Sequence, residues 1–399
     1  MTPEPSPKLP LEGLVVVGIE QAVAAPLATR HLADLGARVI KIENPRGGDF
    51  ARDYDSAVNG IAAHFVWCNR GKESLSLNLR SDAGAEVMEA LLGRADVLIQ
   101  NLAPGAAARR GLAAEQVVAR HPRVIAVDIS GYGEGGPLEQ RRAYDLLVQS
   151  EAASCAVTGL PGQPAKPGIP VADIAVGMYA YSSVLAALYD RERTGRGTAI
   201  AVSMFDSVAE WMGYPLHYTL GTGIEQDPRG VGSPAVAPYG AYPTADGESL
   251  VLGTTNDAEW QRLATLVIER PDLAADSAFA RNADRVERRE LLDPQIGAWT
   301  SVRTLPEITA RLDEAGIGYA RLNGVQALID HPQLAERGRW TEVGSPVGPL
   351  PALLPPPVSR SWPLQPGDVP GLGEHTDLVL DWLGYDGSRI AELREQGVV

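Results

Sequence analysis

The amino-acid sequence predicts an α/β protein whose larger part is built on a parallel β-sheet. Short runs rich in β-branched residues alternate with stretches of helical periodicity up to about Gly221. After that residue this regular alternation stops. Prolines become dense between Gly344 and Gly373. Alternating strands and helices typically form a parallel sheet with helices on both faces. We therefore expect one large domain of this kind, followed by a smaller α+β domain.

The first elements form a βαβ unit. Residues 14–19 are a short apolar run, residues 24–35 have helical periodicity, and residues 38–42 are a second apolar run. The alternation continues with a helix near 83–92, a strand at 96–100, a helix near 114–120 and a strand at 123–129.

The most apolar long stretch, residues 174–189, follows Asp173. It predicts a buried helix rather than a membrane span, because serines interrupt it and a charged run ends it. A strand at 198–203 extends the large domain, and a helix over 205–220 leads out of it.

The second domain begins with a hairpin signal. An Asp-Gly turn at 246–247 separates strand-like runs at 238–242 and 249–252. The proline-rich segment predicts an extended crossing rather than a packed element. The other expected elements are helices at about 258–268, 285–300 and 305–315, a strand at 318–322, and short helices at 377–383 and 388–396.

Composition limits the classes of function. The chain has 399 residues, of which 45% are hydrophobic and 21% charged, as expected of a globular protein. Its net charge of −15, without a dense basic run, argues against a nucleic-acid partner. Cys68 and Cys155 show neither CxxC spacing nor a histidine partner, so we expect no disulfide framework and no metal. Residues 1–10 resemble a flexible tail rather than a signal peptide, which favours a cytoplasmic protein without a membrane partner.

A GxGxxG spacing occurs at residues 131–136, directly after a predicted strand. Pro137 and a polar run follow it instead of an apolar helix, so a dinucleotide site is not favoured and a mobile glycine-rich loop is. The histidines form no HExxH motif and no evident triad. His375 is expected to cap or precede the following helix.

Several basic residues lie near the predicted strand ends, where open α/β sheets bind ligands. In an acidic protein, this group suggests a phosphate-bearing ligand. Its members are Lys41, Arg46, Arg52, Arg70, Lys72, Arg80, Arg109 and Arg142.

Asp173 lies at the start of the long apolar helix. By position alone it is expected to be an N-cap, because aspartate readily accepts the unpaired amides of a first helical turn. The same position would keep the carboxylate ionised, since aligned peptide dipoles stabilise an anion there. An ionised carboxylate in such a place can also act as a nucleophile.

A series of short motifs, in order from about residue 11 onward, resembles the family III CoA-transferases (CaiB/BaiF family). This group includes formyl-CoA transferase and carnitine CoA-transferase. The motifs are Leu11-Glu12-Gly13, Ala24-Ala25-Pro26, residues 35–43, Asn69-Arg70-Gly71-Lys72, residues 96–101, Tyr144-Asp145, residues 168–173, Thr194-Gly195-Arg196-Gly197 and Gly373-Glu374-His375-Thr376.

The resemblance implies a Rossmann-like large domain, an inserted small domain and a homodimer of interlocked rings. The expected divisions are a flexible tail at 1–10, a CoA-binding large domain at 11–220, a small α+β domain at 221–340, and a return segment with C-terminal helices at 341–399. It also implies an enzyme of acyl-CoA metabolism whose substrates are an acyl-CoA thioester and a free carboxylic acid, with no permanently bound cofactor.

By the same resemblance, Asp173 is the nucleophile, forming a mixed anhydride and then an aspartyl-CoA thioester. A backbone amide around Val23 would stabilise the oxyanions, and Gly230 and Gly232 would belong to the loop over the active site. The residues implied for CoA binding are Ala24, Leu77, Asn78, Arg80, Asn101, Leu102, Arg109, Arg142 and Tyr144.

Three departures from the formyl-CoA transferase pattern bear on the substrate. Val23 stands where that relative has a glutamine, Asn44 replaces an arginine-type nucleotide contact, and the glycine loop is shortened to residues 230–233. These changes disfavour oxalate. A small dicarboxylate of the succinate or mesaconate type is expected instead.

Two alternatives remain. α-Methylacyl-CoA racemases share the implied fold and exchange a proton with a histidine and an aspartate. This chain has Tyr144 at the histidine position, and a tyrosine with an ordinary pKa near 10 transfers protons poorly at neutral pH. The second alternative is a non-catalytic acyl-CoA-binding protein, which retention of Asp173 disfavours.

Overall fold

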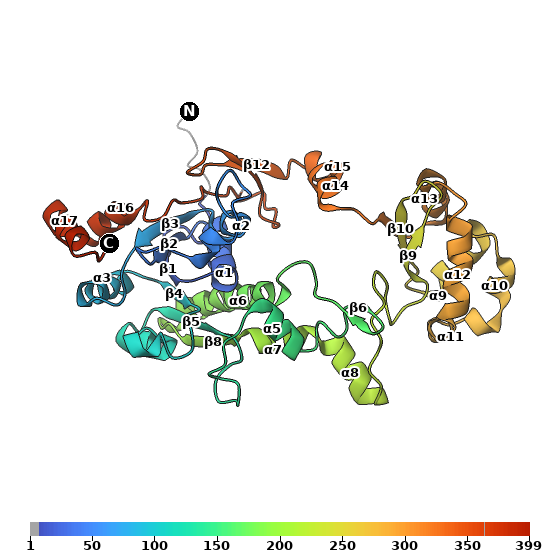
Figure 1. The fold of residues 1–399 in the computed structure, drawn as a ribbon, viewed down its shortest axis with the longest axis horizontal. Coiled ribbons are helices and arrows are strands. Elements are labelled where there is room, and N and C mark those ends of the chain that lie inside the picture. Colours follow the sequence, from blue (N-terminus) through green and yellow to red (C-terminus); the bar gives the residue numbers. More distant parts are fainter. Residues whose placement is uncertain (1–7, 363) are drawn as a thin grey trace. The chain divides into compact units, whose positions relative to one another are not determined.

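The computed structural model describes residues 8–362 and 364–399, which form two compact units (Figure 1). The large unit comprises the chain up to Ser154, Pro167–Gly213 and Ala335–Val399. The second unit comprises Cys155–Lys166 and Tyr214–Leu334. The short segment ending at Lys166 thus groups with the second unit, which the sequence alone did not suggest.

A parallel sheet of six strands forms the centre of the large unit. In spatial order the strands are β3 (Lys72–Ser76), β2 (Arg38–Glu43), β1 (Val15–Ile19), β4 (Val97–Gln100), β5 (Ile125–Ser130) and β8 (Ala199–Ser203). Strand β1 pairs in parallel with β2 on one side and with β4 on the other, and the strand order reverses between β1 and β4. In such sheets the reversal point is where ligands bind, at the carboxyl ends of the strands.

Helices cover both faces of this sheet, as the alternating pattern predicts. On one face, buried residues of the strands form a core with α1 (Ala24–Asp34), α6 (Val171–Thr194) and α7 (Met204–Trp211). The other core contains α3 (Asp82–Leu92), α4 (Ala114–Arg120), α16 (Thr376–Leu383) and α17 (Gly387–Glu395). Successive residues alternate between the cores, as a pleated strand requires: Val16 belongs to the first core and Val17 to the second.

Helix α6 is long and apolar enough to cross a membrane by length and composition. In this structure its Ala172, Val176, Ala180 and Val184 instead form a stripe inside the first core. The spacing of four residues is that of one helical face. The predicted helix is therefore present with one face buried, and it begins earlier than expected, at Val171.

The motif at residues 373–376 lies along the edge strand β3. The Gly373 and His375 amides donate to Ser74 Oγ and O at 2.9 and 3.0 Å. The Ser76 amide donates to Thr376 Oγ1 at 3.1 Å. His375 directly precedes α16, as predicted, but it makes no side-chain cap: its Nδ1 accepts from the Ser74 amide at 3.3 Å. The motif covers an otherwise exposed sheet edge.

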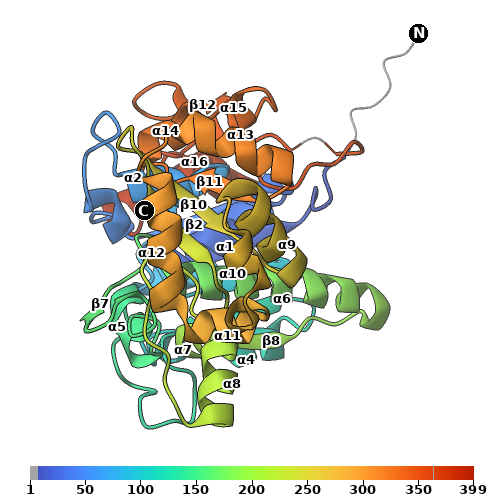
Figure 2. The ribbon, with the colours of Figure 1, turned by 90° about the vertical axis from the view of Figure 1, so that its right-hand side faces the viewer.

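The second unit is built around an antiparallel sheet in the order β11-β10-β9, of which Figure 2 labels β10 and β11. Its strands β9 (Tyr239–Pro243) and β10 (Ser249–Gly253) form the predicted hairpin, and β11 (Tyr319–Arg321) pairs with β10. One apolar core joins this sheet to several helices of the unit. They are α9 (Asp257–Arg262) with a π-helical turn at Leu263–Val267, α10 (Pro271–Ala275), α12 (Arg289–Thr300) and α13 (Leu305–Ala315). The unit also contains α11 (Asn282–Glu287) and α14 (Val325–Ile329).

Other elements depart from the sequence expectation. The region expected to be one helix over 205–220 forms two helices. The first, α7, ends at Trp211, and the second is α8 (Gly213–Thr222). Strand β3 contains a single apolar residue, Leu75, and was not predicted. Nor were α2 (Ala63–Asn69) and α5 (Asp145–Glu151). The proline-rich region contains a packed strand, since β12 (Trp340–Val343) pairs with β13 (Leu350–Leu353).

Candidate functional site

A cavity of about 770 Å³ opens at the carboxyl ends of β1, β4 and β5. It lies entirely within the large unit, at the point where the strand order reverses. The loops that follow these three strands line it, together with the start of α6. A concave site of this size at a topological switch point is the place where an α/β protein is expected to hold a small-molecule ligand.

Asp173 lines this cavity from the first turn of α6. The expectation that it is the N-cap is wrong: the cap residue is Pro170, and Asp173 is the third residue of the helix. The cap hydrogen bonds come from another helix, because Asp145 Oδ1 accepts from the Ala172 amide at 2.9 Å. Asp173 therefore lies in the first turn of α6, at the positive end of the helix dipole, but it is not the N-cap of that helix.

Helices α1 and α6 cross very closely beside Asp173. A Cβ atom built on Gly177 would lie 2.7 Å from the carbonyl oxygen of Ala24, the first residue of α1. One turn earlier in α6, Ile174 packs against Val23 and Leu27. The small residues at the crossing bring the start of α1 to the start of α6, so Val23, Ala24 and Asp173 line one cavity.

The turn before α1 has an unusual backbone. Ala22 adopts a positive φ of 62°, which residues with a Cβ rarely adopt. Its amide donates to Asp49 Oδ1 at 2.9 Å. Asn101 holds the preceding residue from the other side: its Oδ1 accepts from the Gln21 amide and its Nδ2 donates to the Gln21 carbonyl, both at 2.9 Å. Several hydrogen bonds thus fix the turn that ends at Val23.

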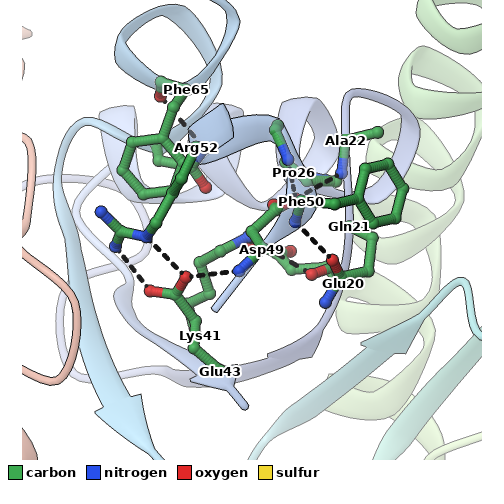
Figure 3. Close-up of polar contacts among 12 residues, drawn as sticks. Glu20, Gln21, Ala22, Pro26, Lys41, Glu43, Asp49, Phe50, Arg52 and Phe65 are labelled. Carbon is green, nitrogen blue, oxygen red and sulfur yellow. Dashed lines mark hydrogen bonds and ion pairs between the residues drawn. The ribbon is translucent and has the colours of Figure 1, made fainter. Parts of the chain in front are cut away.

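A buried ionic network lies beneath this turn (Figure 3). Lys41 Nζ is 2.7 Å from Asp49 Oδ2, and Lys72 Nζ is 2.6 Å from Glu20 Oε1. Lys41 Nζ is also 3.4 Å from Glu20 Oε1, which joins the two pairs. Burial opposes the charge of Glu20, but Lys72 and Lys41 outweigh it and hold the pKa of Glu20 below its ordinary value. Burial lowers the pKa of Lys72 to about 8 despite the opposing effect of Glu20.

Several of the basic residues expected to bind phosphate form ion pairs within the protein. Lys41 and Lys72 are buried in the ion pairs just described, and Arg52 pairs with Glu43 at 2.7 Å. Arg70, also buried, pairs with Asp34 at 3.1 Å. None of these four residues lines the cavity. Their positions near strand ends are explained by ion pairs within the fold.

Aromatic side chains form part of the cavity wall. Phe50, Tyr54, His64 and Tyr144 all line it. Tyr54 stacks edge-on against His64, with ring centroids 5.5 Å apart. Burial, followed by the charges of Asp49 and Asp173, raises the pKa of Tyr54 to about 12, so its hydroxyl stays protonated at neutral pH.

The cavity brings together part of the set expected to bind CoA. Ala24, Asn101, Leu102, Arg142 and Tyr144 line it, together with Asp173 and the expected oxyanion residue Val23. Among the described residues, its lining does not include Leu77, Asn78, Arg80 or Arg109. Leu77 is buried in the second core. Arg109 lies beside the cavity, because its guanidinium would be 2.8 Å from a Cβ atom built on the lining residue Gly105.

Asn78 and Arg80 lie in the turn after β3, where Asn78 Oδ1 accepts from the Arg80 amide at 3.1 Å. Gly230 and Gly232 belong to the second unit. There the Gly230 amide donates to the Gly159 carbonyl.

Sequence reasoning missed four residues that shape the site, namely Glu20, Asp49, Tyr54 and Asp145. Asp145 was within reach, because it belongs to the Tyr144-Asp145 motif. Asp49 carried a local signal as well, since its Oδ1 accepts from the Ala51 amide two residues on. For Glu20, the ion-pair partners Lys41 and Lys72 lie 21 and 52 residues away in sequence. Among the described residues, no group of three or more histidine, cysteine, aspartate or glutamate side chains is arranged to hold a metal ion.

The chain is similar over its length to curated transferases. One is a succinyl-CoA:glutarate CoA-transferase of Mus musculus, 31% identical, covering 98% of this chain and 90% of that protein. Another is an acetyl-CoA:oxalate CoA-transferase of Acetobacter aceti, 33% identical, covering 86% and 88% respectively.

Among solved structures, a CAIB/BAIF family protein from Brucella suis superposes with a TM-score of 0.81 at 32% identity. That match covers 94% of this chain and all of the other. The family model described as CoA-transferase family III matches residues 11–376. The chain therefore belongs to CoA-transferase family III, the CaiB/BaiF family.

Proposed function

We propose that this protein moves CoA from an acyl-CoA thioester to a small dicarboxylic acid, with Asp173 as the nucleophile. The observation that carries the proposal is the position of Asp173, in the first turn of α6 and on the wall of the cavity at the strand ends. The curated relatives support the substrate class, because their names specify succinyl-CoA with glutarate, or acetyl-CoA with oxalate.

The proposed exchange begins with attack by an oxygen of the Asp173 carboxylate on the thioester carbonyl. The C–S bond breaks, giving a mixed anhydride and a CoA thiolate. The thiolate then attacks the Asp173 carbonyl, expels the donor acid as a carboxylate and forms an aspartyl-CoA thioester. The acceptor carboxylate repeats the two steps in reverse order, which yields the new acyl-CoA and regenerates Asp173. Covalent capture divides one difficult exchange into easier steps.

The N-termini of α1 and α6 lie at the site and favour the negative charges that this exchange requires. The positive end of α6 stabilises Asp173 as an anion, and α1 begins at Ala24 with Val23 as a cap residue that offers no side-chain acceptor. The first amides of α1 are then available to an oxyanion that forms in the cavity, which is the role proposed for the backbone around Val23. The protonated Tyr54 hydroxyl, also on the cavity wall, can donate a hydrogen bond to a bound substrate.

The substrate preference follows from the side chains at the turn. Val23 brings no polar group to the position where the oxalate-using pattern has a glutamine. An apolar wall there suits the methylene groups of a longer diacid better than oxalate. Arg142, on the cavity wall, is a suitable partner for a phosphate of CoA or for the second carboxylate. The closing loop at 230–233 and the interlocked homodimer remain parts of this proposal.

The test is to trap the covalent intermediate. The enzyme is incubated with succinyl-CoA, treated with hydroxylamine or borohydride, digested and analysed by peptide mass spectrometry. Modification should map to Asp173, and Asp173→Ala should abolish exchange while retaining CoA binding. Exchange activity without any adduct at Asp173 would refute the nucleophile assignment. A panel of carboxylic acids, including oxalate and C4 to C6 diacids, then tests the acceptor class.

Racemase chemistry predicts a different result. An α-methylacyl-CoA substrate in deuterium oxide would gain deuterium at the α-carbon without exchange of CoA. Tyr144 on the cavity wall, in the place of a proton-transferring histidine, disfavours that outcome.

A further inference from the structure

We propose that Asp145 is the positioning residue of the nucleophile, because its carboxylate caps the helix that carries Asp173. The inference rests on the proposed function, since it concerns how the reacting carboxylate is held. Asp145 is the first residue of α5, and it follows Tyr144, the cap residue of that helix. One short helix thus presents Tyr144 to the cavity and Asp145 to the start of α6.

The hydrogen bonds at the start of α6 can be followed amide by amide. A helix leaves its first amides without partners inside the helix, and buried amides need partners from elsewhere. The Val171 amide donates to the Ile169 carbonyl, and the Ile174 amide to the Pro170 carbonyl, both at 2.9 Å. The two amides between them donate to Asp145 Oδ1, from Ala172 at 2.9 Å and, more weakly, from Asp173 at 3.5 Å.

This arrangement explains why Asp173 need not be the cap. An aspartate near a helix start commonly turns its carboxylate back onto the backbone amides, as the sequence alone suggests. Here Asp145 accepts from those amides, and Asp145 comes from a different helix, 28 residues away in sequence. The backbone of Asp173 is therefore anchored by a side chain at the cavity edge, and its own carboxylate is not required for capping.

Asp145 is itself held in place. Gln149, one turn later in α5 and fully buried, donates from Nε2 to Asp145 Oδ2 at 2.7 Å. Within the part of the chain that the structure describes, Gln149 Oε1 has no hydrogen-bond partner. If the Gln149 amide turns over, Oε1 can accept from a side-chain amide at position 145. Asp145→Asn can therefore keep the Oδ1 cap and a bond to Gln149 while it removes the charge.

That possibility gives a clean comparison of variants. Asp145→Ala removes the cap, Asp145→Asn keeps its geometry, and Asp145→Glu keeps the charge but moves the acceptor by one methylene. If Asp145 acts by positioning, Asp145→Ala should lower kcat by roughly 100-fold, the size of effect that a small misplacement of a reacting group produces. Asp145→Asn should stay within about threefold of the wild type, and Asp145→Glu should fall by roughly tenfold.

Asp386→Ala is the matched control. Asp386 is also an aspartate that caps a helix, since its Oδ1 accepts from the Arg389 amide at 2.9 Å at the start of α17. It lies outside the cavity lining. Its loss should lower the melting temperature, as loss of a cap does, without changing kcat. A purely structural role for Asp145 would make Asp145→Ala behave in the same way.

The measurements are kcat and KM with succinyl-CoA as donor and glutarate as acceptor, the rate of adduct formation at Asp173 in a single turnover, and hydrogen exchange of the peptide spanning 171–176. We expect a fall in kcat with an almost unchanged KM for succinyl-CoA, and faster exchange in that peptide, for Asp145→Ala. Wild-type kcat in a folded Asp145→Ala variant would overturn the inference.

Two further outcomes keep the inference testable if Asp145→Ala does not fold. Wild-type kcat for Asp145→Glu, or a loss in Asp145→Asn as large as in Asp173→Ala, would each overturn it, because neither follows from a displaced or retained cap. Failure of the proposed function is distinct from all of these, since it would appear as the absence of an Asp173 adduct in the wild-type enzyme.

Discussion

Gly177 of α6 lies directly against the carbonyl oxygen of Ala24 at the start of α1, so close that a Cβ at Gly177 would be 2.7 Å from that oxygen. No real Cβ contact is so short, so a larger residue requires one helix to move. Because Val23 and Asp173 lie beside this crossing, the spacing of the two helices sets the geometry of the proposed reaction centre.

Gly177→Ala should therefore lower both stability and activity. We expect a loss of about 1–3 kcal/mol in the free energy of unfolding, as for other overpacked sites, together with a fall in kcat. Gly297→Ala in α12 is the control, since nothing lies within 4 Å of a Cβ at that helical glycine. There alanine should be neutral or stabilise by about 0.5–1 kcal/mol. Equal effects of the two substitutions in thermal unfolding would contradict the prediction.

Removing one cation from the buried network should be costly. Lys72→Met leaves Glu20 with the longer 3.4 Å ion pair to Lys41 and the hydrogen bond from the Thr29 hydroxyl. Breaking a buried ion pair from one side costs roughly 3–5 kcal/mol, and we expect a loss in that range on urea unfolding. The double variant Lys72→Met with Glu20→Gln should recover part of the lost free energy of unfolding, because Glu20 then carries no uncompensated charge. Lys8→Met, at an exposed position, should have little effect.

Stability should fall at acid pH through Glu43. Burial raises the pKa of this carboxyl group, but hydrogen bonds from Arg52 and the charge of Lys41 outweigh it and lower the pKa from 4.5 to about 2. A depressed folded-state pKa stabilises the protein above pH 4.5, by up to about 3 kcal/mol, and the contribution disappears as the pH falls toward 2. The melting temperature of Glu43→Gln should vary less over pH 2–5 than that of the wild type or of Glu336→Gln, an exposed control.

At the strained turn before α1, by contrast, we expect a substitution that does not lower the free energy of unfolding. Ala22 has a φ of 62°, a conformation that glycine adopts without a steric penalty. Ala22→Gly should therefore leave stability unchanged or raise it by up to about 1 kcal/mol, since relief of strain offsets the added freedom of the unfolded chain. Ala33→Gly, inside α1, should instead cost about 0.5–1 kcal/mol. A larger loss for Ala22→Gly in thermal unfolding would show that the turn is not strained.

Much of the fold follows from local patterns. The helix α13 and the hairpin of β9 and β10 were predicted within a residue or two, because periodicity and an Asp-Gly turn are short-range signals. Strand β3 was missed, since its serines and charged residues resemble a loop. Its strand character comes from pairing with β2 and from the cover that Gly373 and His375 provide, and these contacts join distant parts of the chain.

The sequence by itself determined the family, the class of reaction and Asp173 as the residue of interest. The order of the motifs and the chemistry of each residue type can be read from the amino-acid sequence alone. Only the tertiary structure decided what the neighbouring charges do. Lys41 and Lys72 are buried in ion pairs rather than facing a phosphate, and Asp145 rather than Asp173 caps α6. Burial and partners distant in sequence settle such roles, and neither is encoded in the local pattern around a residue.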